Sequence, residues 1–240
     1  MAIKSRRILL AIWPILLFAL VALWIFPISY RVSRCTMLIL MVAVWCGALL
    51  LFGKSKWVQV GSIALALLLA AALLLPGRNE NAAKLRQEYV AALEKYEGTR
   101  YVWGGENWAG IDCSGLVRRG LIDADFKRGW KTANPGLLRA SLALWWFDST
   151  AKALGEEYRG QSRHLFDAAS ISGLDHSKLL PGDFAVTSSG VHTLAYLGNE
   201  VWIEADPGVG KVIRLKVSEG HVWFNGPVRL MRWRQLQSEK

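Results

Sequence analysis

The part of the sequence that most directly indicates chemistry is a single cysteine in the C-terminal two thirds of the chain. Cys113 follows a glycine-rich stretch and lies in the run Asp112-Cys-Ser-Gly-Leu-Val117, where a helix is expected to begin. Backbone N–H groups at a helix N-terminus stabilise a thiolate, the form of cysteine that acts as a nucleophile. Cys35 and Cys46 lie at or within an apolar segment, so we expect no disulfide with them. Cys113 is therefore a candidate nucleophile, the alternative being an inert buried thiol.

A thiol nucleophile needs a base within hydrogen-bond reach and a third group that orients the base. His192 lies on a predicted strand after the turn Pro181-Gly-Asp183 and is the candidate base. Its partner should lie opposite it on a hairpin that turns near residues 197–200. A loop centred on Gly198 pairs His192 with Glu204, whereas a loop centred on Asn199 pairs it with Asp206. The residues alone leave both acids open as the third group.

The remaining histidines do not indicate a metal site. His164, His176 and His221 share no ligand spacing with one another or with an acidic cluster. The run Gly208-Val-Gly-Lys211 lacks the glycine spacing and the following Ser or Thr of a phosphate loop, and it is interpreted as a hairpin turn. We therefore expect no structural metal and no cofactor.

The N-terminal part of the chain predicts a membrane region. Residues 1–78 contain no Asp or Glu and hold three apolar runs, at about 8–26, 37–52 and 57–75. Each is close to the about 20 residues that a helix needs to cross a bilayer. The first run could instead be a signal peptide, but it is long for one and two more runs follow. We predict three transmembrane helices within residues 1–78 and a separate domain over residues 79–240.

The formal net charge of +10 does not indicate a nucleic-acid partner. Eight of the 29 basic residues flank the apolar runs, and the other 21 are balanced by 19 acidic residues in the C-terminal domain. That domain therefore has no excess of positive charge to bind a phosphate backbone. The partner that the basic flanks do indicate is a lipid bilayer.

Three spans place the two ends of the chain on opposite sides of a membrane. Basic residues near the span ends are tied at five on each side; those on the N-terminal side are Lys4, Arg6, Arg7, Lys54 and Lys56, and those on the other are Arg31, Arg34, Arg78, Lys84 and Arg86. Positive-inside bias acts mainly through short loops and the first helix. These considerations favour a C-terminal domain outside the cytoplasm.

After residue 79, helical patterns come first and strand patterns second. Apolar residues at helical spacing predict a helix over about 81–98, and further helices are expected from Cys113 and over 135–154. Short strands are predicted at 184–187, 191–197, 201–205, 212–215 and 228–233. This order indicates an α+β domain. The sequence assigns no function to the segment over about 120–180.

Four motifs in this order resemble those of the NlpC-type cell-wall cysteine peptidases: Tyr101-Val-Trp-Gly-Gly, Asp112-Cys-Ser-Gly-Leu, Pro181-Gly-Asp-Phe and His192 on a strand. The resemblance covers about residues 81–233. It implies a papain-like fold, in which N-terminal helices pack on an antiparallel sheet and the cysteine precedes the histidine. Three membrane spans are not part of the common family pattern.

The resemblance also implies roles for individual residues. Cys113 would be the nucleophile, His192 the base, and Tyr101 would place its hydroxyl near the thiol and the developing oxyanion. The implied substrate-binding residues are Asp112, Ser114 and Trp103. The commonest family pattern has a second histidine twelve residues after the base, where this sequence has Glu204. Family spacing thus favours Glu204 over Asp206, and a carboxylate can also orient an imidazole.

By this resemblance we expect a multi-pass protein of the bacterial cytoplasmic membrane whose catalytic domain faces the periplasm or cell exterior. It would cleave amide bonds in peptidoglycan stem peptides, after D-glutamate. No envelope protein partner can be identified from the sequence. Two alternatives stay open: a catalytically silent membrane scaffold that binds peptide in its cleft, and an amidase or acyltransferase acting on a different substrate.

Overall fold

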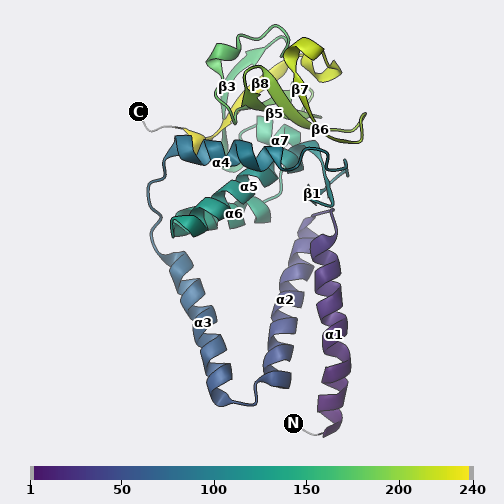
Figure 1. The fold of residues 1–240 in the computed structure, drawn as a ribbon, viewed down its shortest axis with the longest axis vertical. Helices are drawn as coiled ribbons and strands as arrows, with labels where there is room; N and C mark the ends of the chain where they lie inside the picture. Colours follow the sequence, from purple (N-terminus) through teal and green to yellow (C-terminus); the bar gives the residue numbers. More distant parts are fainter. Residues whose placement is uncertain (1–2, 238–240) are drawn as a thin grey trace.

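A computed structural model describes residues 3–237 and consists of three long helices below an α+β domain (Figure 1). The outermost residues of the two predicted regions, 1–2 and 238–240, lie outside the described residues. The connection between the first two long helices and the end of the third meet the α+β domain at its lower side (Figure 1). The domain is therefore held at two places, the connection between the first two helices and the connection after the third.

The long helices are α1 (Ile3–Ile25), α2 (Arg31–Phe52) and α3 (Lys56–Leu74). All three are long and apolar enough to cross a membrane, by length and composition. Helices α1 and α2 pack side by side, with the indole of Trp13 donating a hydrogen bond to the carbonyl of Val44 at 2.9 Å. Helix α2 begins six residues before the predicted apolar run, because the polar turn at Arg31 to Arg34 is also helical.

Four helices belong to the α+β domain: α4 (Ala82–Glu94), α5 (Cys113–Lys131), α6 (Pro135–Trp146) and α7 (Ala151–Gly155). The side chain of Asn81 accepts a hydrogen bond from the Lys84 N–H at 3.0 Å and so caps α4. The single helix predicted over 135–154 is wrong. It is divided into α6 and α7, because Thr150 caps a new helix by accepting a hydrogen bond from Ala153 N–H.

The main sheet has six antiparallel strands in the order β3-β8-β4-β5-β6-β7. Their bounds are β3 (Ser162–Ala168), β4 (Phe184–Thr187), β5 (Thr193–Gly198), β6 (Val201–Asp206), β7 (Lys211–Lys216) and β8 (Val228–Trp233). A small hairpin of β1 (Glu106–Asn107) and β2 (Gly110–Ile111) precedes α5. The predicted strands are confirmed within two residues at each end, and β3 was not predicted.

Helices α4 and α5 pack on one face of this sheet and bury the larger apolar core. Leu93 and Leu116 from the helices meet Phe184 and Ile203 from the strands in that core. Trp202 and Leu230 belong to a second core on the opposite face, which Phe224 helps to cover. The expected α+β architecture, with helices packed on an antiparallel sheet, is therefore confirmed.

A buried group of charges joins the long helices to the domain. Arg34, in the first turn of α2, is 2% exposed, and its guanidinium lies 2.8 Å from the carboxylate of Glu106 on β1. The other oxygen of Glu106 lies 2.5 Å from Arg118 of α5. Arg118 in turn lies 2.6 Å from Asp148. Although Arg34 faces no acid within residues 1–78, it is thus paired in three dimensions with an acid of the domain.

This pairing predicts that Arg34 contributes to stability far more than a surface arginine of the same helix. Losing one partner of a buried ion pair costs about 3 kcal/mol or more, so Arg34→Met should lower the free energy of unfolding by about that amount. The exposed Arg31 provides the matched control, and Arg31→Met should change it by less than about 0.5 kcal/mol. Thermal unfolding of the full chain in detergent micelles measures both; equal melting temperatures for the two variants would contradict the pairing.

Candidate active site

The N-terminus of α5 places Cys113 at the wall of a large cavity. Asp112 caps the helix, with one carboxylate oxygen accepting a hydrogen bond from the Gly115 N–H at 2.6 Å. Gly115 has to be small, because a Cβ there would collide with the carbonyl oxygen of Gly105 in the loop before the helix. This close approach of loop and helix fixes the position of the cysteine.

Cys113 is 6% exposed, and its surroundings have opposing effects on the thiol. Burial, followed by the negative charge of Asp112, raises the pKa of the Cys113 thiol to about 12. The backbone N–H groups of Thr193, Ser114 and Cys113 itself act the other way and favour the thiolate. The resting thiol is therefore protonated at neutral pH, and its use as a nucleophile requires a base that removes the proton.

The cavity beside Cys113 has a volume of about 750 Å³. All the predicted substrate-binding residues line it, namely Asp112, Ser114 and Trp103, as does Tyr101. Burial raises the pKa of Tyr101 well above its ordinary value, and the nearby Cys113 and Asp112 add to this effect. Its hydroxyl thus stays protonated and can donate a hydrogen bond. Trp103 is 73% exposed, so its indole is free to contact a bound molecule.

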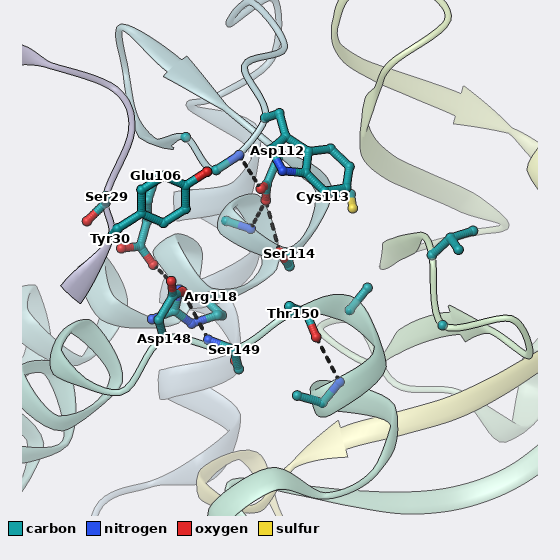
Figure 2. A pocket seen from close by; sticks show the side chains of 18 of the residues that line it. Ser29, Tyr30, Glu106, Asp112, Cys113, Ser114, Arg118, Asp148, Ser149 and Thr150 are labelled. Atoms are coloured by element: carbon teal, nitrogen blue, oxygen red, sulfur yellow. Dashed lines mark hydrogen bonds and ion pairs between the residues drawn. The ribbon is translucent and has the colours of Figure 1, made fainter. Parts of the chain in front are cut away.

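Asp112 lines the cavity, but hydrogen bonds within the protein already occupy both its carboxylate oxygens (Figure 2). One oxygen accepts from the Gly104 N–H at 2.8 Å, and the other accepts from Gly115 N–H and from the Ser114 hydroxyl. The side chain therefore fixes the loop and the helix start. Of the predicted substrate-binding residues, Trp103 is the one with the largest exposed surface.

His192 lies immediately before β5 and is held on three sides. Its N–H donates to the Thr187 hydroxyl at 3.1 Å, and its ring stacks on Trp223 with centroids 4.2 Å apart. Ring nitrogen Nε2 contacts a carboxylate oxygen of Glu204. The next residue, Thr193, presents its backbone N–H to the Cys113 thiol. With Nε2 at Glu204, the ring nitrogen left for the thiol is Nδ1.

The strand register differs from the one that direct pairing of His192 with Glu204 requires. Ala195 pairs with Ile203 and Tyr196 with Trp202, a register that is centred on Asn199. The register shifts at a bulge between Tyr196 and Gly198. Extended to His192, this register points to Asp206. The side chain of Glu204 nevertheless makes the contact, because residues two apart on a strand share one face and the diagonal neighbour is within reach of a long side chain.

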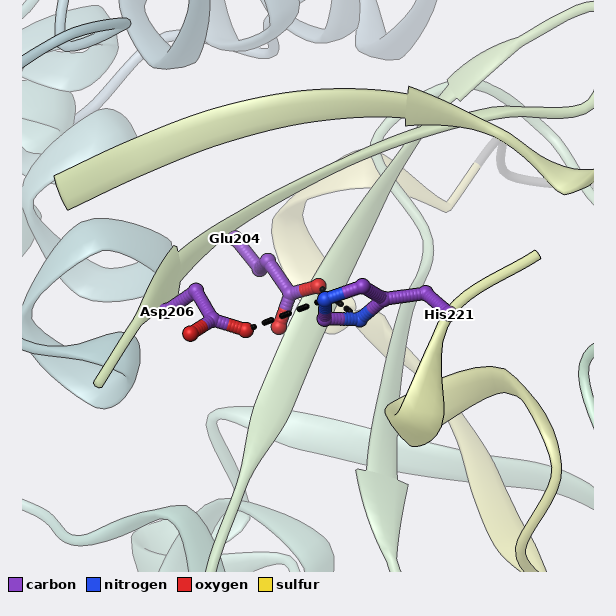
Figure 3. A group of neighbouring side chains, drawn as sticks. All are labelled: Glu204, Asp206 and His221. Atoms are coloured by element: carbon purple, nitrogen blue, oxygen red, sulfur yellow. Dashed lines mark ion pairs between the residues drawn. The ribbon is translucent and has the colours of Figure 1, made fainter. Parts of the chain in front are cut away.

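His221 lies next to both candidate acids, a position that its sequence spacing did not reveal (Figure 3). Its Nδ1 is 3.1 Å from Glu204 Oε1, and its Nε2 is 3.3 Å from Asp206 Oδ2. Glu204, Asp206 and His221 have the residue types of a cation site and lie close enough together to form one. His221 Nδ1 and Glu204 Oε1 nevertheless have no hydrogen-bond partner among the described residues, so the three side chains are close neighbours without a hydrogen-bonded bridge on the Glu204 side.

His221 and Trp223 are thus the two site residues that sequence reasoning missed. Both come from the short segment 221–224, a 3₁₀ turn between β7 and β8. One irregular turn has no periodic pattern that could place it against a particular strand. The signal that was present is the composition His-Val-Trp-Phe, which is unusually aromatic for an exposed connection.

A model of the NlpC/P60 family matches residues 98–229 of this chain. Similar solved structures include NlpC1 from Trichomonas vaginalis, which is 17% identical with a TM-score of 0.41, the match covering 65% of this chain and 46% of that one. The peptidoglycan hydrolase RipB from Mycobacterium tuberculosis is 20% identical with a TM-score of 0.38, over 62% of this chain and 65% of that one. The NlpC/p60 domain of the peptidoglycan hydrolase SagA is 24% identical with a TM-score of 0.35, over 63% and 98%.

The chain spans about half the length of NlpC1, the first of these structures. No match to this chain was found among curated proteins.

The electrostatics of the site predict a pH-dependent reactivity of Cys113. Asp112→Asn keeps a helix-capping side chain and removes the negative charge that helps to raise the thiol pKa. The pKa of Cys113 should therefore fall, and the thiolate fraction at any pH below that pKa should rise. We expect alkylation of Cys113 by iodoacetamide at pH 7–9 to become several-fold faster, because the rate follows the thiolate fraction.

The experiment uses a background in which Cys35 and Cys46 are replaced by serine, so that only Cys113 reacts. Asp148→Asn is the matched control, because Asp148 lines the same cavity but is not among the groups that shift the Cys113 pKa. An unchanged alkylation profile in Asp112→Asn, or an equal change in Asp148→Asn, would contradict the assignment.

Proposed function

Because this chain belongs to the NlpC/P60 family, we propose that it is a membrane-anchored cysteine peptidase that hydrolyses amide bonds in peptidoglycan stem peptides. RipB and SagA, two of the similar structures, are peptidoglycan hydrolases. The observation that supports the proposal most directly is the contact of His192 with Glu204, beside the backbone N–H that faces the Cys113 thiol. These three residues supply a nucleophile, a base and an orienting acid.

In the first step, His192 Nδ1 takes the proton of the Cys113 thiol, and the thiolate attacks the carbonyl carbon of the scissile amide. Burial makes an isolated thiolate at this position costly. The imidazolium formed on His192 offsets that cost, and Glu204 stabilises the imidazolium through Nε2. The role of Glu204 is therefore to orient the ring and to balance its charge.

The attack produces a negatively charged oxygen that needs hydrogen-bond donors. The backbone N–H of Cys113 at the helix N-terminus is one donor, and the protonated hydroxyl of Tyr101 is the other. Donors held in place before the reaction stabilise the transition state without reorganisation. The tetrahedral intermediate collapses as His192 protonates the leaving amine, which gives a thioester on Cys113.

Hydrolysis of the thioester completes the cycle. His192, again neutral, removes a proton from a water molecule that attacks the acyl carbon, and Cys113 leaves as the thiolate and recovers its proton. The bond proposed to be cleaved is the one after D-glutamate, as the family resemblance implies. Trp103, exposed at the cavity wall, is proposed to contact the peptide.

The three long helices are proposed to span the bacterial cytoplasmic membrane, with the catalytic domain on its outer side. Their length and composition support the spanning role, and their side chains are largely exposed, as expected for contact with lipid. The spans would then replace a separate wall-binding module as the tether of the enzyme.

The proposed function predicts that fragment release from cell wall depends on Cys113. Purified peptidoglycan incubated with the full chain in detergent should yield soluble muropeptides, and Cys113→Ala should lower their release by about a thousandfold or more. Cys46→Ala, in α2, is the matched control and should retain full activity. Release that is equal for the wild type and Cys113→Ala, or absent from both, would instead favour a silent scaffold or an enzyme for another amide.

The proposed sidedness predicts the behaviour of reporter fusions at the C-terminus. Alkaline phosphatase, which is active only outside the cytoplasm, should be active there, and a fluorescent protein that folds only in the cytoplasm should be dark. The same two reporters inserted after residue 54, in the connection between α2 and α3, should give the reverse pattern. A fluorescent C-terminal fusion would exclude cleavage of external peptidoglycan.

A further inference from the structure

The connection between the first two long helices forms part of the wall of the cavity that holds Cys113. Ser29 and Tyr30 line this cavity together with Cys113 and Asp112 (Figure 2). Residues 26–30 lie between the end of α1 and the start of α2. The cavity is thus incomplete without a segment of the proposed membrane region.

Backbone hydrogen bonds attach this connection firmly to the catalytic domain. The N–H of Ser29 donates to the carbonyl of Gly104 at 3.0 Å, and the N–H of Glu106 donates to the carbonyl of Pro27 at 3.0 Å. The side chain of Asn107 adds a hydrogen bond to the carbonyl of Phe26 at 2.9 Å. The connection therefore behaves as a fixed part of the cavity wall.

Tyr30 is the residue of this connection that can contact a bound molecule. Its ring covers Gly104, where an added Cβ would lie only 2.7 Å from the tyrosine hydroxyl oxygen. Gly104 in turn donates its N–H to Asp112, the residue before the nucleophile. Half of the Tyr30 surface remains exposed. An aromatic ring in this position offers a flat surface to a ligand that extends away from Cys113.

The floor of the cavity beside Tyr30 is charged but balanced. Glu106, Arg118 and Asp148 line the cavity, and Arg34 of α2 completes the group from behind. Two guanidinium groups thus face two carboxylates, and Asp148 at the end of the group is 44% exposed. This floor can form polar contacts with a ligand without attracting a polyanion.

The position of Tyr30 relative to the spans indicates where its ligand must lie. Tyr30 is the last residue before α2, and α1 ends five residues earlier at Ile25. Aromatic residues directly at the ends of spans lie at the level of the lipid head groups. A second cavity of about 140 Å³ shares Ser29 and Glu106 with the first and is lined by Trp24 and Met37 of the spans. Ser29 and Glu106 therefore lie between the cavity of Cys113 and a smaller cavity at the long helices.

We propose that the cavity binds a stem peptide carried on a membrane lipid, and that Tyr30 is a specificity-determining residue for that substrate. This inference rests on the proposed function and adds its substrate class. The peptide lies against Cys113 and Trp103, and the part of the substrate nearest the lipid lies against Tyr30. Peptidoglycan polymer that lies far from the bilayer has to approach a cavity located at the level of the lipid head groups. A lipid-linked peptide is already held at that level by its own anchor.

The test compares one stem peptide in two forms, with the full chain reconstituted in liposomes. The peptide is either joined through its sugar carrier to a lipid in the same vesicles or free in solution. We expect the lipid-linked form to have the higher kcat/KM. Tyr30→Ala should lower kcat/KM for the lipid-linked form about tenfold more than it lowers kcat/KM for the free peptide.

Trp57→Ala is the matched control, because Trp57 is an exposed aromatic residue at the opposite end of the long helices. It should leave both rates unchanged. Tyr30→Phe retains the ring and should keep most of the preference. Tyr30→Leu fills the space over Gly104 without an aromatic ring and should lose the preference as Tyr30→Ala does, which provides a second variant if Tyr30→Ala does not fold.

Each outcome decides the proposal. A preference that persists unchanged in Tyr30→Ala or in Tyr30→Leu would come from shared membrane attachment alone and would overturn the assignment of Tyr30. Equal rates for the two forms in the wild type would overturn the substrate class and leave the proposed peptidase function standing. Cleavage of neither form would overturn the proposed function and this inference with it.

Discussion

The rest of the structure depends on the buried carboxylate of Glu106. It lies between Arg34 of α2 and Arg118 of α5, so one side chain joins the long helices, the small hairpin and the helix that begins with Cys113. A buried charge is stable only when it is paired with an opposite charge, since removing one partner leaves the other buried and unpaired. Folding of the domain and docking of the long helices are therefore energetically linked. That linkage explains why a buried arginine, Arg34, lies in the first turn of a helix that is apolar over most of its length.

A similar balance of charge governs the chemistry at Cys113. Burial and Asp112 hold the resting thiol protonated, which limits oxidation and alkylation while no substrate is bound. The carboxylate of Glu204 contacts the imidazoles of both His192 and His221, and the carboxylate of Asp206 lies near the imidazole of His221. In the proposed mechanism, a positive charge on His192 forms beside a carboxylate that is already in place. His221 lies next to both carboxylates in the same space.

The sequence predicted the elements that have a clear local signal. Asp112 and the glycine-rich loop marked the start of α5, and short apolar runs after the turn residues Pro181-Gly-Asp183 and Asn225-Gly-Pro227 marked β4 and β8. Strand β3 was missed because its sequence, Ser-Arg-His-Leu-Phe-Asp-Ala, contains no β-branched residue. The pair Arg34–Glu106 joins α2 to β1, and the pair His221–Glu204 joins a short irregular connection to β6. No pattern along the chain encodes such contacts, because they arise only when packing brings the segments together.

The connections to the long helices determine how far the domain can move. A single flexible linker would let the domain move through a volume that the length of the linker sets. Here the connection before α2 is bonded into the cavity wall, and the one after α3 is also fixed: the side chain of Asn134 exchanges hydrogen bonds with Arg78, and Arg139 of α6 bonds the carbonyl of Leu75. The segment 120–180, to which the sequence assigned no function, thus supplies the second attachment through α6. Two fixed attachments hold Cys113 at one height above the long helices. Under the proposed function, this fixed height restricts the bonds that the proposed enzyme can reach.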